Sequence, residues 1–540
     1  MTVDRTVSAS SLVRSTIVFL VILVGVCIAL SGSGAAAPAA PTDHTLSQPN
    51  GTSFTATQWG TEDNHGWQTT DGYTIVQGSD GWWWYATVDA GALVPTDRKV
   101  GIDTPPESVP KGVRGAADTS HRHSSAGAPA SAAVGTSAQA ASAGIQPAPT
   151  TGTVRYPVIL ITYPDTNTTA SSREFQQLLF GTDPAIASGP GSMQDFYLEA
   201  SNGQLTVDGT VSAWVTADHG HDYYDNEIRA AELVQEAARK ADGQIDYSQY
   251  DNNGDGYVDG VIVIHQGAGE EVTGNPADIW SHRWSLSSAA YYGAPVSPYA
   301  SNDGVTINDY SANPETSFDG QISTVGVFAH ETGHLLGMTD LYDTDYSSNG
   351  IGEWGLMGVG SWNYDGSPPR RVGNSPAHPV AFHKWQQGWI TPSQQPLTGP
   401  MRPLDSYART SDTFQWLDNP YGVEIGGTGE YFLATYRTQT GFDQGLPGEG
   451  VLITHIDESQ TDNTNENHKL VDIEAADGDQ DLDAGRPGDA GDPFPSQASA
   501  GFAPDTTPSS NLYDGSESGL RITEFNLQDN QAQYITKPVS

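Results

Sequence analysis

The stretch from residue 330 to residue 340 holds the most specific chemistry in this chain. His330 and His334 lie four positions apart, so on a helix both imidazoles share one face and can bind one zinc ion. Glu331 beside them is suited to act as a general base for water. Gly337 can adopt the left-handed conformation that turns the chain back, which would bring Asp340 to the metal as a third ligand. Three protein ligands leave the fourth position open for water, as in a catalytic zinc site.

The surroundings of this stretch distinguish a metal site from a chance match, which would be only a polar helix face. An apolar run at 322–329 predicts a buried helix over about residues 323–336. A glycine-rich segment at 353–362 follows and contains Met357, and metzincin-type peptidases carry a methionine turn beneath the zinc. An ordinary core methionine is the alternative for Met357. We predict a zinc peptidase, with Asp343 as the first alternative to Asp340.

Several blocks along the chain occur in a recognisable order. They are Phe54-Thr55-Ala56, Trp59-Gly60, Asp71-Gly72-Tyr73-Thr74, 251–260, Asp278-Ile279-Trp280-Ser281-His282, the zinc segment with Leu341-Tyr342-Asp343, Gly355-Leu356-Met357, 445–450 and His455-Ile456-Asp457. With these blocks the chain resembles the immune inhibitor A-like family of secreted bacterial metallopeptidases. The resemblance implies an α/β zincin-like, metzincin-type catalytic domain preceded by a propeptide. It also implies an aspartate as third ligand, where better known metzincins have histidine.

The composition excludes some classes of partner. The 540 residues carry a formal net charge of −42, with only 23 Lys and Arg. Such a surface argues against binding nucleic acid or an anionic membrane. It suits a soluble secreted protein, and we expect a monomer that acts on protein or peptide substrates.

The N-terminus predicts export from the cell. An apolar run at 16–30 follows Arg5 and Arg14 and precedes small residues, which is typical of a signal peptide over residues 1–40, cut near 37–40. A retained anchor is the alternative, but the run is short for a membrane span. Cys27 is the only cysteine and lies in this run, so the mature protein has no disulfide. We predict a secreted, extracellular protein without stable membrane association.

The rest of the chain divides by composition. Residues 41–113 are rich in aromatic and turn residues and predict a small β-rich domain, which stands where the family has its propeptide. Residues 114–150 are rich in Ala, Ser, Gly and Pro and predict a disordered linker open to proteolysis. Residues 151–395 alternate buried strands and helices and predict the catalytic domain. Residues 396–540 show short strands and turns and predict an all-β C-terminal module.

A second metal site is suggested by residues 251–259. Alternating oxygen-bearing residues around Gly256 match the first part of a calcium loop. A glutamate twelve residues from the start is missing, since Ile262 stands there, so the loop is not a complete EF-hand. A polar turn before a strand is the alternative. The candidate ligands are Asp251, Asn253, Asp255, Tyr257 through its carbonyl, and Asp259.

Other polar residues have weaker patterns. The acidic stretch at 472–492 could hold calcium but is more typical of a solvated loop. Tyr364 follows the methionine turn and is a candidate for stabilising an oxyanion. Four further histidines fit hydrogen-bonded structural roles better than zinc ligation: His282, His378, His383 and His455.

These observations favour a secreted zinc endopeptidase that is made as a zymogen. Since no propeptide cysteine is available, latency requires another zinc ligand, such as Glu62 or Asp63, or burial of the site. Two other classes stay open: a zinc-dependent cell-wall amidase, and a non-catalytic surface protein on the same scaffold. An intact Glu331 argues against the second, because a scaffold has no use for a general base.

Overall fold

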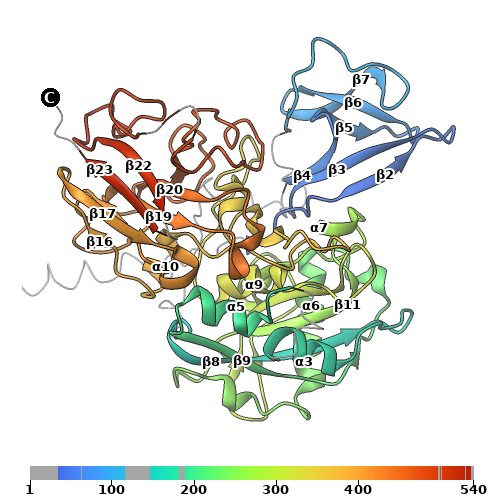
Figure 1. Ribbon diagram of the computed structural model, residues 1–540. Coiled ribbons are helices and arrows are strands. Elements are labelled where there is room, and N and C mark those ends of the chain that lie inside the picture. The colour runs from blue at the N-terminus through green and yellow to red at the C-terminus, as the bar shows by residue number, and fades with distance from the viewer. Residues whose placement is uncertain are drawn as a thin grey trace, which may run out of the picture.

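The described chain consists of an α/β body and two β-structures, one from each end of the chain. The computed structural model describes residues 35–62, 64–115, 146–181, 189–496, 499, 501–528 and 531–536. Figure 1 shows the N-terminal strands in blue above helix α7 (Glu270–Thr273), the C-terminal strands in orange and red beside them, and an α/β body below both. In these described ranges no helix is long and apolar enough to cross a bilayer. The apolar run at 16–30 lies outside them.

The α/β body is built on one mixed sheet in the order β1-β12-β15-β11-β8-β10, with β9 also paired to β8. β8 pairs in parallel with β9, β10 and β11, and β11 pairs in parallel with β15. β12 runs antiparallel to β15, and β1 runs antiparallel to β12. The apolar run in β8 is buried on both faces, as expected of a central parallel strand. The strands are β1 (Ala35–Ala36), β8 (Gly152–Thr162), β9 (Leu205–Val211), β10 (Val215–Thr216), β11 (Val261–Ala268), β12 (His282–Ser285) and β15 (Asp309–Thr316).

Helices cover both faces of this sheet, because alternate side chains of β8 point to opposite sides. Val158 and Leu160 join the core beneath α3, α5 and α9, and Ile159 and Ile161 join the core beneath α6. The helices are α3 (Ser172–Phe180), α5 (Met193–Ala200), α6 (Glu227–Ala241), α8 (Leu286–Tyr291), α9 (Val325–Leu335) and α10 (Ala381–Gln386). Shorter elements are β13 (Tyr299–Ala300), β14 (Thr306–Ile307), η1 (His221–Tyr223), η2 (Tyr247–Tyr250), η3 (Gly352–Trp354) and η4 (Val359–Trp362). The buried helix predicted around the two histidines is α9.

The N-terminal sheet is a six-stranded antiparallel meander in chain order. Its hairpin β5–β6 forms around Gly81, whose φ of +79° suits a tight turn. Among the described residues its core contains four buried hydrophobic side chains: Ala56, Ile75, Tyr85 and Val100. The strands are β2 (Asp43–Ser47), β3 (Ser53–Thr61), β4 (Asn64–Thr69), β5 (Thr74–Gln77), β6 (Trp83–Asp89) and β7 (Ala92–Lys99).

The C-terminal region contains two sheets, in the orders β16-β18-β19-β20-β21 and β17-β23-β22. Their elements are β16 (Ser393–Gln394), β17 (Gly399–Asp405), α11 (Tyr407–Thr410), β18 (Phe414–Trp416), β19 (Glu430–Arg437), η5 (Gly441–Gly445), β20 (Gly450–Asp457), β21 (Val471–Ile473), β22 (Ile522–Gln528) and β23 (Gln531–Thr536). The helix α11 is an exception to an all-β pattern.

The core of the body does not end at residue 395, where the sequence suggested a domain boundary. Leu341 and Trp354, from the loops after α9, share one buried cluster with Tyr431, Leu433 and further residues of the larger C-terminal sheet. Apolar side chains of these loops and of the C-terminal sheet bury one another. The C-terminal sheets therefore support the loops that carry the predicted metal site.

Candidate metal centre

Helix α9 presents His330 and His334 toward one point. Their Nε2 atoms lie 3.1 Å apart, and both side chains are buried. The Nδ1 atom of His330 is 3.0 Å from the carbonyl of Leu356, and that of His334 is 2.9 Å from the carbonyl of Met338. A carbonyl only accepts, so each Nδ1 carries the proton and each Nε2 keeps a free lone pair. This second layer of contacts orients both rings for a metal.

Asp340 completes the group. Gly337 has a φ of +89° just after α9, and the chain turns there as the sequence predicts. The Oδ1 atom of Asp340 then lies 3.2 Å from His330 Nε2 and 3.3 Å from His334 Nε2. Burial alone would raise the pKa of Asp340, but the two neighbouring imidazoles, when protonated, lower it below its usual value. Positive charge at this point thus stabilises the charged carboxylate, and a metal ion would supply the same charge.

The three ligand atoms have the spacing that zinc requires. Nitrogen and oxygen ligands about 2.0–2.1 Å from a tetrahedral ion lie about 3.3 Å from one another. Within the part of the chain that the structure describes, these three residues are one of two groups of His, Cys, Asp or Glu able to hold an ion. The buried donor set of His330, His334 and Asp340 thus fits zinc with one position left open.

Glu331 lies in the same buried site. Its Oε1 accepts a hydrogen bond of 3.0 Å from the backbone N–H of Ala37, and its Oε2 is buried without a hydrogen-bond partner in the described residues. Burial, followed by the nearby carboxylates of Asp340 and Glu271, raises its pKa well above the usual value. A buried carboxylate that readily takes up a proton is suited to general base chemistry.

The methionine turn lies directly under α9. Gly333 leaves space for Met357, since a Cβ at that position would come within 2.9 Å of the methionine sulfur. The backbone N–H of Leu341 donates to the Met357 carbonyl at 2.8 Å, and Leu356 accepts from His330. The turn predicted from its single methionine therefore supports both the helix and one ligand.

The chain's own residues 35–40, here called the bound segment, cross this site. Ala36 pairs with His282 in the antiparallel β1–β12 ladder, so the segment adds a strand to the free edge of the sheet. The hydroxyl of Tyr342 donates to the carbonyl of Ala36 at 2.9 Å, and burial raises the pKa of Tyr342, which keeps its proton available. The predicted cut near 37–40 falls inside this segment.

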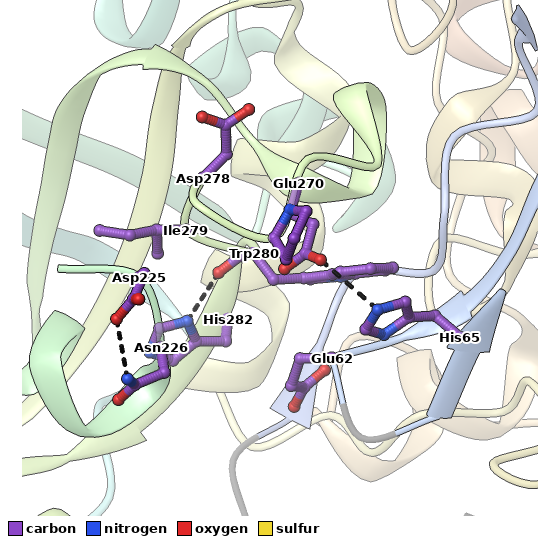
Figure 2. Close-up of a pocket in the computed structure, with 10 residues that line it drawn as sticks. Glu62, His65, Asp225, Asn226, Glu270, Asp278, Ile279, Trp280 and His282 are labelled. Carbon is purple, nitrogen blue, oxygen red and sulfur yellow. Dashed lines mark hydrogen bonds and ion pairs between the residues drawn. The ribbon is translucent and has the colours of Figure 1, made fainter. Parts of the chain in front are cut away.

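A small cavity lies beside the bound segment, between the N-terminal sheet and the body. It has a volume of about 70 Å³ and is lined by Glu62 and His65 from one side and by Glu270 and Trp280, among others, from the other. Figure 2 shows the ion pair that joins His65 to Glu270, 3.4 Å long, across this boundary. Glu62 is not a member of the zinc-binding group. Asp63, its alternative as a latency ligand, lies outside the described residues.

The part of the chain that carries α9 and the methionine turn is similar to known proteins. Residues 165–390 match the family model for the catalytic domain of immune inhibitor A peptidase M6. The matched region contains β9 to β12, β15, α9 and the methionine turn, whereas β1 and the central strand β8 precede it. The family resemblance read from the sequence blocks is thus confirmed, together with mixed α/β content of the matched domain.

Two curated relatives extend the match. An immune inhibitor A from Bacillus thuringiensis subsp. alesti is 33% identical over 235 residues, covering 36% of this chain and 32% of that protein. The pre-pro-metalloprotease PrtV of Vibrio cholerae serotype O1 is 30% identical over 288 residues, covering 45% and 29%. The chain thus spans about a third of the length of the curated relatives it matches.

Several residues near the candidate metal centre have contacts with other parts of the protein. Asp343 accepts hydrogen bonds from the backbone of Asp345 and Ser348 and so stabilises the loop after Asp340. The ring of Tyr364 lies 5.1 Å from the guanidinium of Arg370. The hydroxyl that contacts the bound segment is instead that of Tyr342, which sequence reasoning missed. Its only signal was a tyrosine two positions after the third ligand.

The four histidines that the sequence suggests are structural, His282, His378, His383 and His455, are all buried. His282 contacts the carbonyl of Trp280, His378 contacts Glu199, and His455 contacts Glu430 and Glu474. None belongs to the zinc-binding group among the described residues, and neither does buried His383.

The loop at 251–259 does not gather three carboxylates at one point in the described structure. Asp251 accepts hydrogen bonds from the backbone of Gly254, Asp255 and Gly256, and Asp259 accepts from Asn252 and Asn253. The second group able to hold an ion lies instead in the acidic stretch and consists of Asp477, Asp489 and Asp492. Asp492 already accepts from the indole of Trp354 at 2.7 Å. Calcium at Asp251, Asn253, Asp255, Tyr257 and Asp259 stays a prediction.

Proposed function

We propose that this chain is a secreted zinc-dependent endopeptidase that is made as a zymogen. The observation that carries the proposal is the placing of a backbone peptide bond against Glu331, beside the His330, His334 and Asp340 group. A metallopeptidase requires a metal, a general base and a peptide that lies close to both. The family match and the metalloprotease relatives support the same activity.

His330, His334 and Asp340 would hold the zinc. When bound, zinc supplies Lewis acidity, which lowers the pKa of water and polarises a carbonyl. Glu331 takes a proton from the attacking water and returns it to the leaving nitrogen as the C–N bond breaks. In the bound segment this nitrogen position is taken by Ala37 N, which already contacts the Glu331 carboxylate.

The bound segment also favours an endopeptidase that takes extended chains. Its backbone continues on both sides of Glu331, with Ala36 on the β12 ladder and the Pro38 carbonyl accepting from Trp362 Nε1 at 2.8 Å. An edge strand recognises main-chain groups in this way, with little dependence on side chains. We also propose that the body has a metzincin-type fold and that the N-terminal sheet is its prodomain.

The latent form would depend on this segment. Residues 35–40 precede the N-terminal sheet directly, and the linker at 114–150 follows it. While the segment occupies the edge of β12, a substrate cannot pair there. Cutting the linker would allow the sheet and segment to leave together. This requires that signal cleavage leaves the segment on the chain.

Three substitutions test the zinc assignment. We expect Glu331→Ala to reduce peptide hydrolysis by at least about 1,000-fold while zinc stays bound, because only the base is removed. Asp340→Ala is expected to lose zinc, whereas Asp343→Ala keeps it. Metal content and hydrolysis of casein and of muropeptides are measured for each. Hydrolysis of muropeptides alone would indicate an amidase, and zinc loss in Asp343→Ala alone would reassign the third ligand.

Calcium binding at 251–259 is proposed as a stabilising element. The oxygen-bearing side chains of the loop also hold the end of the linker, since Asn253 donates to the carbonyls of Gln146 and Pro147. A cation that binds only the folded state at 100 times its dissociation constant adds about 2.7 kcal/mol. We expect a higher melting temperature when calcium is added to stripped protein, and no such rise in Asp251→Ala. An equal rise in both proteins would place the ion elsewhere.

A further inference from the structure

The peptide bond between Ala36 and Ala37 lies between two functional side chains. On one side its N–H donates to Glu331 Oε1 at 3.0 Å. On the other side its carbonyl oxygen accepts from the hydroxyl of Tyr342 at 2.9 Å. One group thus contacts the nitrogen that would leave in hydrolysis, and the other contacts the oxygen on which charge would develop.

The bound segment has the orientation of a peptide held for cleavage. It pairs antiparallel with the edge strand β12, in the register Ala35 to Arg283 and Ala36 to His282. Trp280 Nε1 donates to the carbonyl of Ala37 at 2.7 Å, so the next peptide is fixed as well. These contacts use backbone groups that every peptide has, and a foreign substrate can repeat them.

Tyr342 is held rigidly in this position. It is 4% exposed, and its ring stacks on that of Tyr346 with centroids 5.9 Å apart. With the bound segment and Trp59 of the N-terminal sheet packed against Tyr342, its hydroxyl has few alternative directions and little contact with water. A preorganised donor in a dry site stabilises developing charge far more than the same donor in water.

We propose that Tyr342 is a catalytic residue whose hydroxyl stabilises the oxyanion of the scissile peptide. This rests on the proposed peptidase function. As the water oxygen bonds to the carbonyl carbon, the C=O electron pair moves to the oxygen that Tyr342 contacts. When the pair returns, the C–N bond breaks and the nitrogen takes its proton from Glu331. Tyr342 keeps its own proton throughout.

A positioning role is the competing explanation, because Tyr342 also lies close to the third ligand Asp340. If its hydroxyl only fixed that carboxylate, removing it would weaken metal binding in parallel with activity. If it stabilises the oxyanion, removing it slows turnover and leaves the metal in place. The two roles therefore differ in a measurement other than activity.

The test compares Tyr342→Phe with Tyr346→Phe in the full chain, with a protease site engineered between residues 116 and 145 and cut before assay. Both changes remove one buried tyrosine hydroxyl and keep the ring, and the hydroxyl of Tyr346 has no hydrogen-bond partner in the described residues. The values of kcat and KM are measured on a peptide containing Ala-Ala, and zinc retention is measured against increasing chelator.

We expect Tyr342→Phe to lower kcat by about 100-fold to 1,000-fold, as for loss of one oxyanion donor, with KM within about threefold of wild type. Zinc retention should match wild type. Tyr346→Phe should match wild type in kcat, KM and zinc retention.

Three outcomes would overturn the assignment. They are an unchanged kcat in Tyr342→Phe, a zinc loss that accounts for its lower activity, and an equal fall in kcat in Tyr346→Phe. A wild-type protein that binds zinc yet cleaves no peptide would instead contradict the proposed function, and the role of Tyr342 with it.

Discussion

The two β regions that flank the catalytic body are attached to it in different ways. The N-terminal sheet contacts the body at its rim, through the ion pair of His65 with Glu270 and the ring contact of Trp59 with Tyr346. The C-terminal region shares a buried core with the loops after α9. In that region the guanidinium of Arg437 pairs with Asp443 at 2.9 Å.

This difference separates a removable part from an integral one. The N-terminal sheet has a small core of its own and a predicted linker after it. Its Trp59 packs in a small cluster with Tyr342 and Tyr346, so we expect that it can leave by exposing that cluster while the core beneath α6 stays covered. The C-terminal sheets cannot, because their departure would expose Leu341 and Trp354 and leave the loops near the zinc site unsupported. We therefore expect the N-terminal side to control activity and the C-terminal side to control stability.

The largest expected effect is on the C-terminal side. Arg437→Met would leave Asp443 buried without its charged partner and remove the 2.9 Å hydrogen bond from Arg437 to the carbonyl of Trp354. Breaking such a buried pair costs about 3–5 kcal/mol. We expect that loss in the free energy of unfolding, with zinc release in the same transition. Urea unfolding followed by tryptophan fluorescence and a zinc indicator measures both.

The matched control for this change is Arg98→Met in the N-terminal sheet. The side chain of Arg98 is 50% exposed, and its neighbour Asp97 is 89% exposed. We expect no measurable change in the unfolding of the body. If Arg437→Met unfolded the C-terminal region in a separate step while zinc stayed bound, the two flanking regions would be equally independent.

The second effect is on activity. When the linker is cut at an engineered site within 114–150 and the N-terminal piece is removed, we expect hydrolysis to rise at least about tenfold, equivalent to about 1.4 kcal/mol. The reason is that the tethered segment competes with substrate at an effective concentration on the order of millimolar. Assays before cutting, after cutting and after size-exclusion separation give the comparison.

The control for the linker experiment is the same protein without the engineered site, treated with the same protease. The melting temperature of the remaining body should stay the same. Equal activity before and after removal would show that the N-terminal sheet is not inhibitory, and a large fall in melting temperature would show that it is integral.

The smallest effect is at the rim contact. His65→Ala removes the partly exposed pair with Glu270, and such pairs contribute at most about 1 kcal/mol. After the linker is cut, we expect the N-terminal piece to dissociate up to about fivefold faster, as followed by fluorescence of a labelled piece. Asp97→Ala on the same sheet should dissociate at the wild-type rate. A far larger effect of His65→Ala would make this contact, rather than the bound segment, the main attachment.

Local patterns in the sequence were enough to predict which residues gather at the candidate metal centre. The spacing of His330 and His334, the turn at Gly337 and the oxygen ligand Asp340 lie within eleven residues, and helix geometry relates them without any distant contact. The apolar run of β8 predicted a buried central strand for the same reason: a strand buried on both faces must be apolar at every position.

Only the tertiary structure decided what faces this machinery. The contact of Ala37 with Glu331 joins residues 294 positions apart, and that of Tyr342 with Ala36 joins residues 306 positions apart. The small residues around Ala37 looked like part of a signal cleavage region, because backbone hydrogen bonding leaves no pattern in side-chain types. The sequence also could not predict that the body and the C-terminal region share a core across residue 395. Apolar periodicity shows that a face is buried, but not which surface covers it.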